Sequence, residues 1–189
     1  KQAFFPNSNT PLFFVHYKLP QGASVNATSK DLQHIEGWLL QQENVVSVTT
    51  FVGGGATRFM LTYGAEDANP SYGHMIVRAS SLEAIPAITA ALEEKAAADL
   101  PVGEFRTERL VFGPGGGAQI QARFSGPDPV VLRQLGEEAM ARMRAASDDL
   151  LHLRQDWREQ ELVLKPRYAT ERAQAAGVAR DDIASTLQL

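Results

Sequence analysis

The sequence predicts an α+β fold of two ferredoxin-like (split β-α-β) subdomains, the second of them incomplete. Residues 4–112 carry segments in the order β-α-β-β-α-β, which is the order of that fold. A Gly-rich linker is expected at 113–117, and residues 118–189 then repeat the pattern as far as β-α-β-β-α. The second subdomain therefore lacks its closing strand, which would leave a sheet edge exposed.

The composition is that of a folded domain and excludes several classes of function. The 189 residues are 44% hydrophobic and 21% charged, which is ordinary for a globular protein. A net charge of −4 disfavours a nucleic-acid partner, since neutralising phosphates needs a basic face. The absence of cysteine excludes disulfides and thiolate chemistry. Without a signal peptide or an apolar run of roughly 18 residues, the chain is expected to be a soluble domain. Its start at Lys1 and its stop at Leu189 without a closing turn favour a soluble fragment of a longer protein.

The first β-α-β unit is expected at residues 11–52. Side chains alternate along a strand at 11–19, and one parity is apolar and predicted to face a core: Phe13, Val15, Tyr17 and Leu19. Gly22 turns the chain into a helix at about 26–42, whose apolar stripe is Leu32, Ile35 and Leu39. The β-branched segment 45–52 returns as the second strand.

The second half of this subdomain begins with a long loop. Residues 53–73 hold five glycines and no sustained period, and long loops inside compact domains are usually functional or mobile. A strand at 74–79 and a helix at about 82–98 follow, with Pro86 close enough to the helix start to be tolerated. Pro101 ends that segment, and a fourth strand is expected at 104–112.

The second run of elements starts with a strand at 119–124. Asp128 is placed to cap a helix, and Pro129 suits the first helical position. Two strands are expected at 150–157 and 161–165. A helix from about 169 to Gly177 and a last turn at 181–187 complete the pattern.

No motif in the chain points to catalysis or to a metal. The glycine runs at 53–55 and 115–117 do not continue into a phosphate-binding signature. The four histidines lack the spacing of a metal site. His16 and His74 are expected on neighbouring strands, where contact is conceivable, but solvated histidines are favoured over ligands. No Ser or Cys nucleophile motif occurs, so no catalytic residue, metal or cofactor is predicted.

The parity of the strands gives one sheet face a mixed character. The first strand places Phe14, His16 and Lys18 away from the helices, and the fourth places Glu104, Arg106 and Glu108 on the corresponding parity. The sixth strand, expected within 150–157, ends at Arg154 beside Asp156 and Trp157. Such a face is either half-solvated or the wall of a wet cleft for amphiphilic molecules, where aromatic rings give contact area and charges give orientation.

The chain resembles the RND (resistance-nodulation-division) multidrug efflux transporters of the acriflavine-resistance type. The likeness covers essentially the whole chain, and the order and spacing of its short motifs make it specific. These motifs are Phe4-Phe5-Pro6, residues 18–24 (Lys-Leu-Pro-Gln-Gly-Ala-Ser), residues 52–56 (Val-Gly-Gly-Gly-Ala), residues 124–129 (Phe-Ser-Gly-Pro-Asp-Pro) and residues 173–178 (Ala-Gln-Ala-Ala-Gly-Val).

The resemblance implies that the chain is part of a larger membrane transporter. Residues 4–112 resemble the first periplasmic porter subdomain of the transporter's C-terminal half, and residues 118–189 the first part of the second. Such transporters lie in the inner membrane of Gram-negative bacteria, work as homotrimers driven by the proton gradient, and export amphiphilic drugs, dyes or detergents. They do so with a periplasmic adaptor and an outer-membrane channel.

The resemblance also implies site residues. The loop from residue 53 to about 69 corresponds to a gate, with Gly53, Gly54, Gly55 and Ala56 as its first residues. The substrate-binding candidates are His16, Lys18, Phe51, Phe59, Arg106, Phe112 and Arg154. Family members with a strongly aromatic gate carry phenylalanine where this chain has Gly54 and Ala56, so aromatic contact is expected here from Phe51, Phe59 or Tyr63.

Two other hypotheses about function remain open from the sequence. The first is a regulatory module that binds a small molecule between tandem ferredoxin-like domains, and it requires both sheets to be closed. The second is an enzyme on the same scaffold, and it requires a clustered acid and base with perturbed pKa values in one pocket. The incomplete second subdomain favours the transporter over both.

Overall fold

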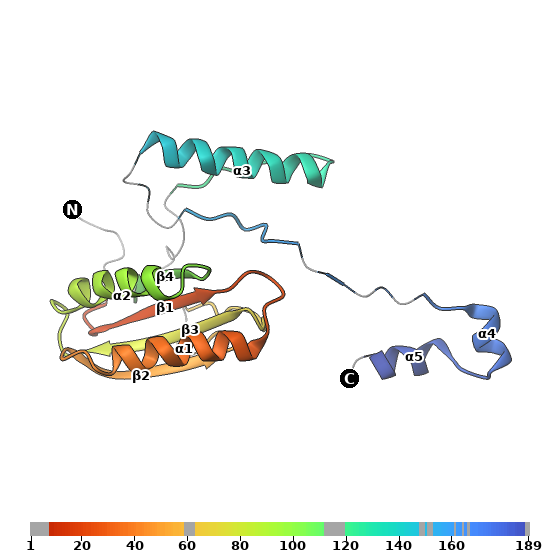
Figure 1. Ribbon diagram of the computed structural model, residues 1–189, viewed down its shortest axis with the longest axis horizontal. Coiled ribbons are helices and arrows are strands. Elements are labelled where there is room, and N and C mark those ends of the chain that lie inside the picture. Colours follow the sequence, from red (N-terminus) through yellow and green to blue (C-terminus); the bar gives the residue numbers. More distant parts are fainter. Residues whose placement is uncertain are drawn as a thin grey trace.

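The computed structural model describes residues 8–58, 63–111, 120–147, 150, 153–160, 162–163, 165 and 167–187. Its centre is a four-stranded antiparallel sheet with the strand order β2-β3-β1-β4. Two helices cover one face of the sheet (Figure 1). The expected order β-α-β-β-α-β is therefore confirmed for the first subdomain, and with it the ferredoxin-like class.

The element bounds lie close to those expected from the sequence. The elements are β1 (Leu12–Lys18), α1 (Val25–Leu39), β2 (Val45–Val52), β3 (Tyr72–Ala79), α2 (Ile85–Asp99) and β4 (Glu104–Arg109). Helix α2 begins three residues later than expected, because residues 82–84 form a turn, with the Ala84 amide donating to Ser81 Oγ at 3.3 Å. Pro86 then lies in the first turn of the helix, where it costs no hydrogen bond.

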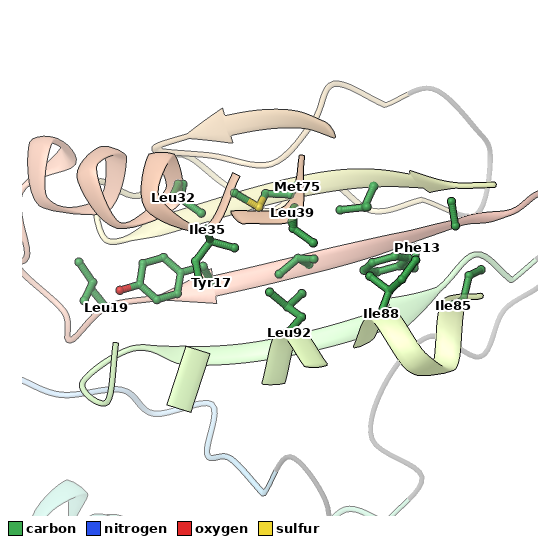
Figure 2. Packing of buried hydrophobic residues seen from close by; sticks show 13 residues of the cluster. Phe13, Tyr17, Leu19, Leu32, Ile35, Leu39, Met75, Ile85, Ile88 and Leu92 are labelled. Carbon is green, nitrogen blue, oxygen red and sulfur yellow. The ribbon is translucent and has the colours of Figure 1, made fainter. Parts of the chain in front are cut away.

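The core fills the space between the sheet and its two helices (Figure 2). Phe13, Val15 and Tyr17 of β1 are fully buried, as their parity predicts. They meet the stripes of both helices, which are Leu32, Ile35 and Leu39 of α1 and Ile85, Ile88 and Leu92 of α2. Burying each such large apolar side chain contributes about 1.5–3 kcal/mol, so this layer holds the first subdomain together.

The helix after the linker forms as expected. Helix α3 (Pro129–Ala146) is capped by Asp128, whose carboxylate accepts from the amides of Val130 at 2.8 Å and Val131 at 3.3 Å. Helices α4 (Thr170–Ala175) and α5 (Arg180–Leu187) follow, and they lie apart from the sheet (Figure 1). None of the helices in the described part of the chain has the length and apolarity needed to span a bilayer.

The strands expected after the linker are not found where the structure describes the chain. Residues 120–124 and 153–157 lie outside any strand, as do the described residues of 161–165. A strand is stabilised by backbone hydrogen bonds to a neighbour, and no described residue of 120–187 is placed as a strand beside these segments. Their apolar side chains accordingly stay exposed, including Ile120, Phe124, Trp157, Leu162 and Val163. The division of the chain into two subdomains, with a linker at 113–117 outside the described residues, stays a prediction.

One segment of this second part does contact the first subdomain. Arg158 donates from its guanidinium to the Leu19 carbonyl at 2.9 Å, and the Gln21 amide donates to Glu159 Oε2 at 3.1 Å. On the other side, Arg133 of α3 donates to the Arg158 carbonyl at 2.7 Å. Residues 158–159 therefore link α3 to the corner that follows β1.

Candidate functional site

The sheet face opposite the helices carries a row of four side chains, one from each strand. The register pairs Phe51 with His74, His74 with His16, and His16 with Arg106. Directly paired residues of antiparallel strands point to the same face. The row runs, in strand order, Phe51, His74, His16 and Arg106, and it brings together three of the residues expected at the substrate site.

The described residues between β2 and β3, 53–58 and 63–71, fold over this row and are called the β2–β3 loop below. Its two ends are joined by backbone hydrogen bonds, from the Gly53 amide to the Tyr72 carbonyl at 2.8 Å and from the Asn69 amide to the Gly53 carbonyl at 3.0 Å. Gly53 has φ +77°, a conformation that favours glycine. Further in, the Gly55 amide donates to the Glu66 carbonyl at 3.3 Å. The expected gate residues Gly53 to Ala56 thus form one side of a closed loop.

The loop buries the centre of the row. His74 is 0% exposed and Ala56 1% exposed. The imidazole of His74 is surrounded by four rings, with centroid distances of 5.0 Å to His16, 5.4 Å to Phe14, 5.7 Å to Tyr63 and 6.1 Å to Phe51. The interpretation of His16 and His74 as solvated histidines is therefore wrong, because a loop without periodicity covers the sheet face that their parity assigns to solvent.

Both histidines are neutral at physiological pH. Burial, followed by Arg106, lowers the pKa of His74 from 6.5 to about 4, although Glu66 opposes the shift. Burial lowers the pKa of His16 to about 2, with further lowering by Arg106, His74, Lys18 and Arg154. Glu108 Oε2 lies 3.7 Å from His16 Nε2. Since desolvation outweighs this carboxylate, the contact joins a carboxylate to a neutral ring and is not an ion pair.

The hydrogen bonds fix which nitrogen of each ring carries the proton. The Tyr72 hydroxyl lies 2.7 Å from His16 Nδ1 and donates to it, since burial raises the pKa of Tyr72 well above its usual range. The Ala56 amide donates to His74 Nδ1 at 3.3 Å. The proton of each ring therefore resides on Nε2, and both Nε2 atoms are buried without a hydrogen-bond partner among the described residues.

Charged side chains form the rim of the row. Lys18 Nζ lies 3.3 Å from Glu66 Oε1 and 5.4 Å from the centre of the Tyr72 ring. Arg106 forms an ion pair with Glu108, and both side chains are about three-quarters buried. The rim therefore pairs opposite charges next to aromatic surface, which suits a ligand with an apolar body and a polar end.

The remaining substrate-binding candidates are Arg154, Phe59 and Phe112. Arg154 is exposed, yet it is close enough to lower the pKa of His16. Phe59 and Phe112 lie outside the described residues.

A pocket lies between α4 and α5, around Tyr168, Ile183 and Leu187, and none of the expected site residues lines it. The described residues also contain no group of three or more His, Cys, Asp or Glu side chains that could hold a metal ion.

Two central residues of the site were not predicted as substrate-binding residues. These are His74 and Tyr72. The alternation of β3 gives a signal for both, because Tyr72, His74 and Ile76 share the parity that faces away from the core residues Met75 and Val77. Tyr63 was expected as one source of aromatic contact at the gate, and its ring does stack on that of His74.

The sequence model of the AcrB/AcrD/AcrF family matches residues 1–189. The chain belongs to the AcrB/AcrD/AcrF family. This confirms, at the level of the family, the resemblance to RND transporters that the sequence motifs indicate. No curated protein sequence matches the chain.

Two solved structures share the fold of this AcrB/AcrD/AcrF chain. They are X-ray crystal structures of a heavy metal efflux pump in crystal forms I and II, with TM-scores of 0.68 and 0.64. Sequence identity is 14% in both cases, and the matches cover 98% of this chain but only 20% and 19% of the pump chain. The AcrB/AcrD/AcrF chain thus spans about a fifth of the length of the pump that it resembles.

Proposed function

We propose that this chain is a substrate-conducting part of the periplasmic porter region of a proton-driven RND multidrug exporter of the acriflavine-resistance type. The observation that carries the proposal is the row Phe51, His74, His16 and Arg106 beneath the β2–β3 loop. An aromatic surface bordered by paired charges offers contact area and orientation without demanding one ligand shape. The chain does no covalent chemistry in this proposal, and it needs no cofactor.

In this proposal the β2–β3 loop is the gate and the row is the surface that it covers. Phe51 supplies apolar contact, His16 a buried polar group within the row, and Lys18 and Arg106 the charged rim. Arg154, which is close enough to lower the pKa of His16, adds a further positive charge to that rim. Phe59 and Phe112 are further candidates for apolar contact. The cargo would be amphiphilic drugs, dyes or detergents.

The setting of the whole protein is part of the same proposal. The transporter would lie in the inner membrane of a Gram-negative bacterium, with this chain on the periplasmic side. It would work as a homotrimer with a periplasmic adaptor and an outer-membrane channel. Family membership and the shared fold with a pump chain about five times as long support this setting.

Drug susceptibility of cells that carry the whole transporter tests the proposal. Phe51→Ala removes half-buried aromatic surface from the row, whereas Val46→Ala changes a side chain that is 60% exposed on the same strand. At equal expression, the first variant is expected to lose resistance to at least part of a panel of amphiphilic drugs, and the second to retain it.

Two results would count against the proposal. One is equal resistance of both variants across the panel. The other is a wild-type transporter that changes no drug's toxicity. Tolerance to divalent transition metals is measured in the same strains, because the similar solved structures are of a heavy metal efflux pump. If the transporter changed the tolerance of cells to metals but not to drugs, the proposed cargo would be metal ions and not drugs.

A further inference from the structure

His74 holds the β2–β3 loop at two points. Its Nδ1 accepts a hydrogen bond from the Ala56 amide at 3.3 Å and lies 3.4 Å from the Tyr63 hydroxyl. Tyr63 lies seven residues after Ala56 in the loop, and its ring stacks on the His74 ring at an angle of 22°. One side chain of the sheet therefore contacts both arms of the loop.

This contact depends on the protonation state of the ring. Neutral imidazole has one nitrogen that accepts and one that donates, while the protonated ring donates from both. A proton on Nδ1 would face the N–H of Ala56, so that two donors would point at each other. It would also place a charge at a site that is 0% exposed.

We propose that His74 is a proton-sensitive latch, which holds the β2–β3 loop on the sheet when neutral and releases it when protonated. The consequence for transport rests on the function proposed above, but the movement of the loop does not. His74 is a positioning residue in this proposal, because it acts on the loop and needs no contact with cargo.

The charged and titratable groups around His74 set the direction of the response. From β1 the group is His16, from β4 it is Arg106, and from the loop they are Tyr63 and Glu66. Burial and Arg106 outweigh Glu66, so the closed state holds the pKa of His74 at about 4, against 6.5 for an exposed histidine. The open state thus binds protons more readily between these two pH values, and acid favours opening. Going from pH 7.5 to pH 5 should raise the open-to-closed ratio by roughly 30-fold.

A distance between two spin labels reads the position of the loop directly. Gly64 lies in the loop and Gly37 on α1, and a Cβ at either position would meet nothing within 4 Å. The chain has no cysteine of its own, so Gly37→Cys and Gly64→Cys give two defined label sites. The measurement is made on the whole protein at pH 7.5 and pH 5, after any cysteines outside this chain have been replaced.

Three variants separate the latch from general effects of acid. His74→Asn keeps an acceptor near the position of Nδ1 but cannot titrate there, so the label distance is expected to stay at the closed value at both pH values. His74→Phe keeps a ring for stacking but has no acceptor, so a longer or broader distance is expected even at pH 7.5. His16→Asn removes the other histidine that the loop covers, so the pH response that remains in this variant belongs to His74, and loss of the whole response would assign the latch to His16 instead.

An unchanged label distance in the wild type between pH 7.5 and pH 5 would overturn the proposal. So would a pH response of His74→Asn equal to that of the wild type, because the loop would then open without titration of His74. Drug resistance of the same variants is scored separately. If the label distance responds to pH in a protein that exports no drug, the proposed function is refuted and the latch is supported.

Discussion

Gly73 of β3 lies directly against Leu32 of α1. A Cβ on Gly73 would stand 2.2 Å from Leu32 Cδ1 and 3.1 Å from its Cγ. Leu32 is fully buried in the core, so its side chain has little room to move. We expect Gly73→Ala to lower the free energy of unfolding by about 1–3 kcal/mol, the usual cost of overpacking. Urea denaturation measures this change.

A second glycine provides the control for that prediction. A Cβ on Gly37, on the exposed side of α1, would meet nothing within 4 Å. Gly37→Ala is therefore expected to raise the free energy of unfolding by about 0.5–1 kcal/mol, because alanine favours a helix over glycine. If Gly73→Ala proved as harmless as Gly37→Ala, the close packing of α1 on β3 would be refuted.

Gly55 is expected to control closure of the β2–β3 loop. A Cβ there would stand 2.8 Å from the Glu66 amide nitrogen and 3.0 Å from the Tyr63 hydroxyl, so the two arms of the loop must separate to admit it. A cost of about 1–3 kcal/mol corresponds to a 5- to 150-fold shift towards the open loop. At equal expression, Gly55→Ala should make cells with the whole transporter more sensitive to drugs.

The neighbouring glycine is a matched control for loop closure. A Cβ on Gly54 would come no closer than 3.9 Å to another atom, the Cα of Ala68. Gly54→Ala is thus expected to leave drug resistance near the wild-type level. Equal loss of resistance in both variants would mean that the glycines act through flexibility and not through the close approach at Gly55.

The two buried histidines should make the folded state sensitive to acid. In the unfolded chain a histidine titrates near 6.5, while the pKa values of His16 and His74 in the folded protein are about 2 and about 4. Below pH 6.5 the unfolded state therefore binds protons that the folded state does not. The free energy of unfolding should fall as the pH falls from 6.5 to 4, by up to about 1.4 kcal/mol per pH unit for each histidine.

Urea denaturation at several pH values between 7.5 and 4.5 measures this slope. Replacing both residues, as His16→Gln with His74→Gln, removes the two groups and should flatten the profile over this range. A slope unchanged by the double replacement would show that other groups cause the acid sensitivity.

The sequence predicted the first subdomain well because its signals are local. Alternation along β1 identified the buried Phe13, Val15 and Tyr17, and the stripe of α1 identified the side chains that meet them. The cap at Asp128 is also a local signal, and it placed the start of α3 correctly. The strands expected at 119–124, 150–157 and 161–165 depend on partner strands, which no local pattern supplies.

The site was predicted in part for the same reason. Parity placed His16, Lys18 and Arg106 on one face, and the register confirms that His16 pairs with Arg106. The burial of His74 depends on where an irregular loop folds, and periodicity carries no information about that. The sequence therefore indicated the correct face but assigned its central histidine to solvent.

Arg158 should hold residues 153–160 against the first subdomain. Its side chain is 19% exposed, and its guanidinium donates to the Leu19 carbonyl at 2.9 Å, next to the bond from the Gln21 amide to Glu159. A net loss of about 1 kcal/mol for such a hydrogen bond corresponds to a roughly fivefold larger equilibrium constant for opening of this contact. Arg158→Ala is expected to speed hydrogen exchange of the Gln21 amide by about that factor at constant pH.

Arg142 offers the comparison for this effect. It forms an ion pair with Glu138 one turn away on α3, but its side chain is 79% exposed, and such surface pairs contribute little. Arg142→Ala should thus leave exchange at Gln21 unchanged. Because residues 153–160 also carry Arg154 towards His16, Arg158→Ala should at the same time withdraw this cation from the rim of the site. Unaltered exchange at Gln21 in Arg158→Ala would show that Glu159 alone holds the segment in place.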